Sequence, residues 1–349
     1  QDLLSTLVEH YFVNANAYMP LLHRPTFQKS IREGQHFRDQ EFAATLLLAC
    51  AIGSRYCDDL RVRLDDNNSQ YSAGWKYFVQ VPSIEVSPVS RPSCYELQKC
   101  VLMVIFMTGS SNPRGCWTLV GTALRFVQDL GVHRRKMSDV SVTKAQHEHW
   151  KRIFWCLVCM DRMFAVSMGR SVALQDEDIN VDLPIAVDDE YWFDKDGDDL
   201  FEQPPNTPSK IQFFNSWIQL LQIIVFSLRT VTKLCMGLSL GKLVETVTEM
   251  DSALNRWFDT VPSHLRWDPH RKDPIFFSQS VALHSWYYNL QILTHRYFLL
   301  APRSIRDADV QMLPSLAICT NAARTIIHIS HRQMQRGIYG GLNLHFVCS

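Results

Sequence analysis

Long apolar runs and a secretory leader are both absent from this sequence. The longest apolar runs, residues 46–52 and 101–107, are much shorter than the roughly 20 residues that a membrane-spanning helix needs. The first residues contain no basic stretch followed by an apolar core, which is the pattern of a signal peptide. We therefore expect a soluble protein that has no membrane partner.

An excess of charge of one sign is also absent, because 35 basic residues balance 35 acidic ones. A protein that binds DNA or RNA needs a concentrated basic face to displace counterions from phosphate. The basic residues here are scattered, and their densest cluster, residues 133–136, has the pattern of a solvated helix end. The composition therefore argues against direct nucleic-acid binding by this chain.

Cysteine pairs of the kind that bind zinc are missing, although the chain has ten cysteines. Cys156 and Cys159 form one C-x-x-C, but they lie in a continuous apolar run and no second pair or histidine cluster completes a tetrahedral site. A free thiol in such a run is a small core residue. We predict reduced thiols, an intracellular compartment and no metal or other cofactor in this chain.

Nucleotide-binding glycine motifs and the G-x-S-x-G elbow of hydrolases are absent as well. Two acidic pairs, Asp58-Asp59 and Asp65-Asp66-Asn67, are the nearest candidates for the magnesium ligands of an all-α enzyme that ionises prenyl diphosphates. Neither has a matching motif placed on a second helix. We predict that the chain is not an enzyme, and keep an all-α enzyme as the least favoured alternative.

Helical periodicity dominates the rest of the sequence. Ser93 and Glu96 have capping-box spacing, and Gly131 follows an apolar helical pattern at the place of a carboxyl-terminal cap. The predicted fold is all-α, a multi-helix bundle of packed antiparallel helices. The longer predicted helices cover residues 39–56, 95–108, 117–131, 144–168, 211–235, 243–258, 278–300 and 314–335.

An acidic, proline-containing stretch at residues 176–208 interrupts the helical pattern. Such a composition favours a long surface loop that is partly mobile. We therefore predict an amino-terminal half at residues 1–184, an acidic loop at 185–210 and a carboxy-terminal helical half at 211–349.

Several local motifs occur in an order that resembles a known family, the fungal-specific transcription factor domain, or middle homology region, of zinc binuclear-cluster regulators. The resemblance is carried by the run 20–27, by the helix 117–134, by residues 148–170 and by 178–184. It is looser beyond residue 211. The motif residues are His23, Arg24, Pro25, Trp117, Gly121, Arg125, Asp129, Gly131, His133, Trp155, Asp161, Arg162, Gly169, Arg170, Asp178 and Pro184.

The resemblance implies a regulatory region that modulates transcriptional activation in the nucleus. It implies that zinc and DNA are bound by a cluster on the amino-terminal side, outside this chain. Its partners would be the transcriptional machinery or regulatory proteins, and a small-molecule effector and a homodimer are both left open. The alternative on the same fold is a kinetochore-like helical scaffold without a transcriptional role.

Three structural hypotheses follow from the charged motif residues. A charge in an apolar helix must be paired, so we expect Arg125 to form a buried ion pair with Asp161 or Asp129. Arg170, which follows a capping Gly169, is expected either to hold the acidic residues 176–182 against the body or to face solvent unpaired. Residues 23–25 are predicted to break a helix, with Pro25 keeping the two preceding residues extended.

Overall fold

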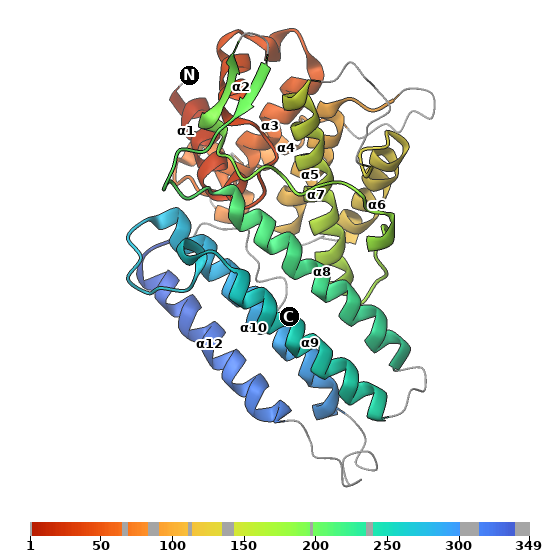
Figure 1. Cartoon of the computed structure of the whole chain (residues 1–349). Coiled ribbons are helices and arrows are strands. Elements are labelled where there is room, and N and C mark those ends of the chain that lie inside the picture. The colour runs from red at the N-terminus through yellow and green to blue at the C-terminus, as the bar shows by residue number, and fades with distance from the viewer. Residues whose placement is uncertain are drawn as a thin grey trace. The chain divides into compact units, whose positions relative to one another are not determined.

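The protein is described from a computed structural model, which places residues 2–64, 69–82, 91–110, 114–134, 143–195, 198–234, 240–300 and 314–338 (Figure 1). Its described part is almost entirely helical, which confirms the predicted all-α class. The α-helices are α1 (Asp2–Tyr11), α2 (Arg24–Arg32), α3 (Gln40–Ser54), α4 (Trp75–Phe78), α5 (Cys94–Thr108), α6 (Arg114–Asp129), α7 (Lys144–Met168), α8 (Ile211–Leu234), α9 (Leu240–Thr260), α10 (Pro274–Leu300) and α12 (Ser315–Gln335).

The helix ends are set by local side-chain chemistry. Ser93 and Glu96 form the predicted capping box at the start of α5. Gly131 and Gly169 both have positive φ, of 74° and 62°, in the left-handed region that only glycine adopts without strain. The amide of Arg170 donates to the carbonyl of Ala165 across the second of these glycines. The glycines therefore end α6 and α7 where the sequence predicted.

The chain divides into two compact units. Unit 1 contains Gln1–Ala165 and Arg170–Asn215, and unit 2 contains Ser216–Tyr339. In unit 1, α3 is the central helix and packs against both α1 and α5, while α5 also packs against α6. Most side chains of α3 are buried, because this helix is apolar around its whole circumference.

A close helix contact in unit 1 depends on Gly53, near the end of α3. A Cβ atom built at Gly53 would lie 2.0 Å from the backbone oxygen of Leu7 in α1. Gly121 in α6, in contrast, has no atom within 4 Å of the same position. The glycine at position 53 is therefore needed for helix approach, and the one at position 121 is not.

We expect Gly53→Ala to lower the free energy of unfolding by about 1–3 kcal/mol, because the backbones of α1 and α3 must separate. Gly121→Ala is the matched control and should raise stability by up to about 1 kcal/mol, since alanine favours a helix interior. Urea denaturation of both variants, followed by far-UV circular dichroism, measures the two effects. Equal midpoints would show that α1 and α3 adjust without cost.

Unit 2 is built around α10, which packs against α9 and α12. Phe277 and Val281 of α10 form a buried cluster with Ile329 of α12. In α9, the indole Nε1 of Trp257 donates to the carbonyl of Ser216 at the start of the unit, at 2.9 Å. Apolar packing thus joins α10 to α12, and a buried hydrogen bond joins α9 to α8.

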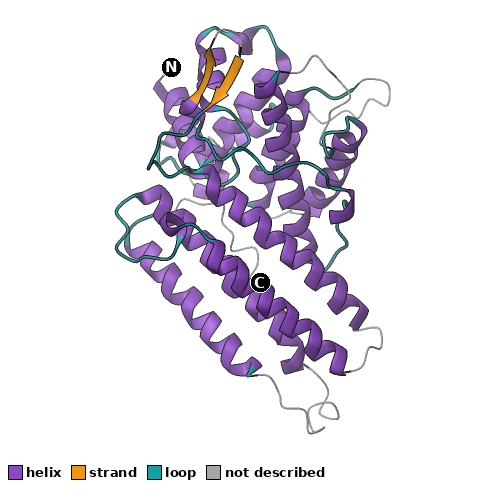
Figure 2. Ribbon diagram, viewed as in Figure 1, coloured by secondary structure: helices purple, strands orange, loops and turns teal. Residues whose placement is uncertain are grey.

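A short hairpin lies within the stretch predicted as an acidic loop. Strands β1 (Trp192–Lys195) and β2 (Asp198–Phe201) pair antiparallel and are the strands of the described part of the chain (Figure 2). These strands are not predicted by the sequence, because four-residue strands with acidic residues show no clear alternation of apolar and polar residues. The other described residues of 185–210 form loop with one 3-10 turn, Asp189–Tyr191, and belong to unit 1.

Candidate functional site

Helix α7 carries an unusual number of buried charged side chains, in a helix whose residues 151–165 are buried all round. Glu148, Arg152, Asp161 and Arg162 are all 2% exposed or less, and Lys151, which is also buried, pairs with Glu148 Oε2 at 2.7 Å. Buried charges require ion pairs or hydrogen bonds, because desolvation otherwise costs several kcal/mol each. The partners of these residues therefore show which part of the chain is bound to α7.

Lys151 lies on α7 itself, and the other partners lie on residues 170–190, called here the return segment. This segment turns at Gly169 and runs antiparallel along α7, since its later residues meet earlier residues of the helix. The contacts are Asp161 Oδ2 with the amide of Ala173 (2.7 Å), Arg162 with Asp176, Trp155 Nε1 with the carbonyl of Asp182 (3.0 Å), Glu148 Oε1 with the amide of Ile185 (2.8 Å), and Arg152 Nη1 with Asp189 Oδ1 (2.6 Å).

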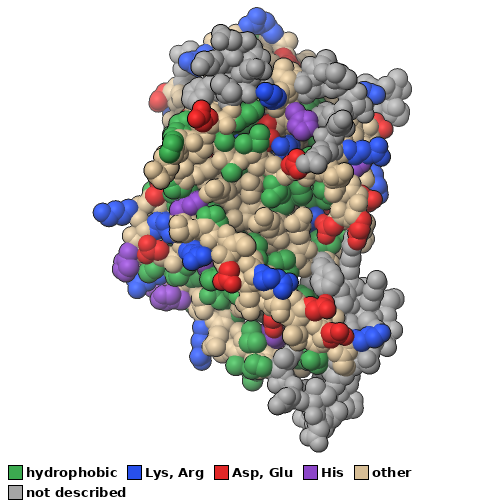
Figure 3. Space-filling view, viewed as in Figure 1, with side chains coloured by type: hydrophobic (Ala, Val, Ile, Leu, Met, Phe, Trp, Pro, Cys, Tyr) green, Lys and Arg blue, Asp and Glu red, His purple; other side chains and the backbone are tan. Residues whose placement is uncertain are grey.

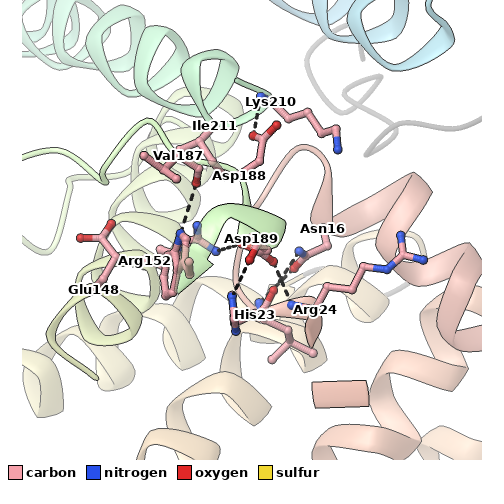
Figure 4. Close-up of polar contacts among 12 residues, drawn as sticks. Asn16, His23, Arg24, Glu148, Arg152, Val187, Asp188, Asp189, Lys210 and Ile211 are labelled. Atoms are coloured by element: carbon pink, nitrogen blue, oxygen red, sulfur yellow. Dashed lines mark hydrogen bonds and ion pairs between the residues drawn. The ribbon is translucent and has the colours of Figure 1, made fainter. Parts of the chain in front are cut away.

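Asp189 is the point where the return segment, α7 and the start of α2 meet (Figure 4). Its Oδ1 accepts from Arg152, and its Oδ2 accepts from the backbone N–H of Arg24 at 2.8 Å. The Nε2 of His23 lies 3.1 Å from the carbonyl oxygen of Asp189. One aspartate therefore joins three segments that are far apart in the sequence.

Aromatic rings enclose this junction. The ring of His23 stacks on that of Trp192, with centroids 4.4 Å apart, and His149 lies against both rings. The Arg152 guanidinium lies over the Trp192 ring at 4.5 Å. Its Nε and Nη2 have no hydrogen-bond partner in the described part of the chain, so the ring face partly replaces water.

Electrostatics at the junction favour a charged Asp189. Burial would raise the pKa of its carboxyl, but Arg152, His23 and the Arg24 amide outweigh burial and lower it below the usual value. Burial lowers the pKa of His23, and Asp189 offsets part of that effect. The ion pair between Arg152 and Asp189 is therefore maintained at neutral pH, beside an imidazole that favours its neutral form.

A second carboxylate holds the far end of the acidic loop. Asp188 is buried, and its Oδ1 accepts from the Ser209 hydroxyl at 2.9 Å and from the amide of Lys210 at 2.7 Å. The amide of Asp188 donates to the side chain of Gln203 at 2.9 Å. Burial raises the pKa of Asp188, and the Ser209 hydroxyl acts against that rise. Hydrogen bonds thus join Asp188, near the start of the loop 185–210, to residues at its end.

Nine of the sixteen motif residues predicted from the sequence lie in or beside the contacts that α7 and the return segment make. The backbone of His133 accepts from the amide of Asn180 at 2.9 Å, and the carbonyl of Pro184 accepts from Asn215. Pro25 lies in the first turn of α2, where its missing N–H costs nothing. The motif residues that lie in or beside these contacts are His23, Arg24, Pro25, His133, Trp155, Asp161, Arg162, Gly169 and Pro184.

The predicted buried ion pair of Arg125 is wrong. Arg125 is exposed and its Nη1 donates to Gln128 at 3.0 Å, and the described residues show no ion pair between it and Asp161 or Asp129. Its two apolar sequence neighbours point elsewhere, because residues i−1 and i+1 of a helix lie on other faces. Asp129 and Asp178 are exposed as well, and a Cβ atom built at Gly121 would have no neighbour within 4 Å.

The prediction that Arg170 holds the acidic segment is also wrong. Its guanidinium lies over the ring of Trp117 at 4.5 Å, and Arg162 is the residue that pairs with the acidic segment, through Asp176. The predicted break at residues 23–25 falls in the right place, with His23 extended. However, α2 already begins at Arg24, so the pair is not extended as a whole.

Sequence reasoning missed Arg152, Glu148, Asp189 and Trp192, which carry the centre of the site. The pattern that could have found the first two is a pair of charges four residues apart inside an apolar helix, Glu148 and Arg152. Nothing in the sequence distinguishes Asp189 from the other acidic residues around it. Its role depends on the fold of residues 170–190.

The chemistry of the site is that of a structural junction. Its ion pairs and hydrogen bonds are internal and buried, and no group of three potential metal ligands occurs among the described residues. Asp59, a candidate magnesium ligand in the sequence, caps a 3-10 turn and pairs with Arg61, while residues 65–67 lie outside the described residues. Within the described ranges, no helix is both long and apolar enough for a membrane.

The thiols of Cys156 and Cys159 are buried in α7, as predicted. Burial raises the pKa of Cys159 to about 12, so this thiol stays protonated. The C-x-x-C therefore belongs to the core of unit 1.

Comparison with known proteins places this arrangement in a family. The chain is 25% identical to the ABC-transporter-regulating transcription factor of Aspergillus fumigatus over 94% of its length, covering 38% of that protein. It is 26% identical to the cutinase transcription factor 1 alpha of Fusarium vanettenii, with 94% of this chain and 34% of that protein covered.

It is also 22% identical to the activator of stress genes 1 of Saccharomyces cerevisiae, over 91% of this chain and 34% of that protein. The chain thus spans about two-fifths or less of the length of these relatives, which are transcriptional regulators and not enzymes. No solved structure matches the chain. The model of the fungal specific transcription factor domain matches residues 8–259, which include α7 and the whole return segment, and the chain belongs to this family.

Proposed function

We propose that this chain is the regulatory region of a fungal transcription factor and that it modulates transcriptional activation in the nucleus. The family match carries this proposal, supported by relatives that regulate transporter, cutinase and stress genes. DNA and zinc would be bound by a cluster outside this chain. The balanced charge supports that division, because a neutral bundle does not attract phosphate.

The buried junction suggests how such a region keeps its form. Five contacts between α7 and the return segment, with Asp189 at one end, fix residues 170–190 to the helix. We propose that the two halves expected from the sequence, residues 1–184 and 211–349, act together as one regulatory region joined by the loop 185–210. Regulatory proteins, a small-molecule effector or a second copy are its proposed partners.

A reporter assay tests the proposal. The chain is fused between a heterologous DNA-binding domain and an activation segment, and reporter output is compared with a fusion in which a flexible linker of equal length replaces it. We expect output to change severalfold, and Asp189→Ala to abolish that change at equal protein level. Gly121→Ala is the control that should behave like the unaltered chain.

Reporter output that is identical with the chain and with the linker would overturn the proposal. The same result would favour the helical-scaffold alternative, in which the fold has no transcriptional role.

A further inference from the structure

Helix α12 of unit 2 has a buried face and an apolar exposed face. Cys319, Ala322 and Ile329 pack inward, and the last of these joins the cluster with α10. Three large side chains are left outside in the same helix. Leu316, Ile327 and Met334 are 67%, 68% and 62% exposed.

These three side chains form one line. They are separated by about three and about two helical turns, so they lie above one another on the same side of the helix. Six of the other large apolar residues of the described chain are also exposed, but they lie in unit 1. We call Leu316, Ile327 and Met334 the α12 stripe.

One flank of the α12 stripe is basic. Residues 315–336 contain no Asp or Glu, while Arg324, His331 and Arg332 are exposed. Arg332 lies nearly half a turn from the stripe, so the flank consists of Arg324 and His331. At 100° per residue, Arg324 and His331 lie within about a quarter turn of the stripe. Large apolar side chains aligned on one exposed helix face, with positive charge beside them, are features that an amphipathic helix can cover.

Arg336, at the end of α12, is bound to the loop before α10. It donates to the carbonyls of Arg271 and Pro269, at 2.6 Å and 2.5 Å, and its guanidinium lies 4.0 Å over the ring of Phe277. The loop carries Arg271 and Lys272 but also Asp268 and Asp273, so it adds no net charge to the basic flank. Figure 3 shows Lys, Arg and His side chains, with Asp and Glu side chains among them, along the margin of this end of unit 2.

The combination of features selects one kind of occupant. A second copy of α12 would bring the same positive charges together, which costs free energy. Duplex DNA would use the basic flank but leave the α12 stripe in water. A segment with carboxylates on one side and large apolar side chains on the other matches both features at once.

We propose that the α12 stripe and its basic flank dock an acidic amphipathic segment of another protein. Apolar side chains of the segment cover Leu316, Ile327 and Met334, and its carboxylates face Arg324 and His331. This inference rests on the proposed function for its role in regulation. Binding is measured on the isolated chain, so a failure of binding and a failure of the reporter assay are distinguishable.

The probe is a fluorescein-labelled synthetic peptide of 20 residues, made of Asp, Glu, Leu and Phe, with apolar residues spaced i, i+4, i+7. Fluorescence anisotropy at 50 mM salt measures its dissociation constant. We expect Ile327→Asp and Arg324→Glu each to weaken binding at least tenfold, and 500 mM salt to weaken it severalfold. Both residues are exposed, so neither change should unfold the chain.

Matched controls are available in unit 1. Phe37 is 84% exposed, and Arg32 is an exposed arginine at the end of α2, so Phe37→Asp and Arg32→Glu make the same chemical changes elsewhere. We expect both controls to bind like the unaltered chain. Hydrogen exchange with the peptide bound should show protection in α12.

Several results would each overturn the proposal. The first is no binding at 1 mM peptide. The second is equal binding of a peptide in which Lys replaces every Asp and Glu. The third is an unaltered affinity in both α12 variants, or displacement of the peptide by duplex DNA or by vesicles of anionic lipid at lower concentration than by unlabelled peptide.

Discussion

Asp189→Ala is expected to lower the free energy of unfolding by about 3–5 kcal/mol, because it leaves a buried charge without its partner. The side chain of Arg152 is 0% exposed, and its ion pair with Asp189 is 2.6 Å long. Loss of the carboxylate also removes the acceptor of the Arg24 amide. Urea denaturation followed by circular dichroism measures the loss.

A control lies one residue away. Glu190 pairs with Lys210 at 3.0 Å, but both side chains are well exposed, and such pairs contribute at most about 1 kcal/mol. Glu190→Ala should therefore leave the urea midpoint nearly unchanged. If both variants lose equal stability, the carboxylate of Asp189 has no special role and the segment is held by its other contacts.

The conservative and paired variants separate charge from geometry. Asp189→Asn retains acceptor capacity for the Arg24 amide and should lose less stability than Asp189→Ala. The double variant Arg152→Leu with Asp189→Leu removes both charges and should recover part of the loss, since no uncompensated charge remains. Hydrogen exchange of residues 182–192 should be fastest in Asp189→Ala.

The helices of the fold could be predicted from the sequence because their signals are local. The apolar pattern of α7 gave residues 144–168, which are its observed bounds, and the capping box at Ser93 gave the start of α5 within one residue. Glycines 131 and 169 marked helix ends for the same reason, since a left-handed residue is a property of one position.

The centre of the site could not be predicted, because it depends on contacts between distant residues. Arg152 and Asp189 are joined only when residues 170–190 fold back along α7. The same limitation explains the error at Arg125. The apolar residues before and after Arg125 do not indicate that Arg125 is buried, because consecutive residues of a helix lie on different faces. Composition likewise missed the hairpin, which is defined by pairing between β1 and β2.

The buried position of Asp161 predicts a pH dependence of stability that runs opposite to the usual acid denaturation. Burial raises the pKa of Asp161 to about 6, although the amides of Ala173 and Leu174 and the guanidiniums of Arg162 and Arg125 act in the other direction. In the unfolded chain the carboxyl has its ordinary pKa near 3.8. Folding therefore favours the protonated form of this residue.

The direction in which stability changes with pH follows from the difference between the folded and unfolded pKa values of Asp161. Because the folded pKa is raised, the contribution of Asp161 to stability is fully present below about pH 4 and is lost as the pH rises through about 6. The difference between the two pKa values corresponds to about 3 kcal/mol. The unaltered chain should thus gain stability relative to Asp161→Asn as the pH falls from 7.5 to 4.5.

Asp161→Asn is the informative comparison because asparagine keeps an acceptor for the Ala173 amide and does not ionise. His23 and His133, whose pKa values are lowered by burial, titrate in the same range, but they are present in both proteins and cancel in the difference. Urea denaturation of the pair at intervals of half a pH unit gives the curve. A difference in unfolding free energy that stays constant from pH 4.5 to 7.5 would mean that α7 holds Asp161 as an ordinary carboxylate, and that the Ala173 contact contributes to the turn after α7 through hydrogen bonding alone.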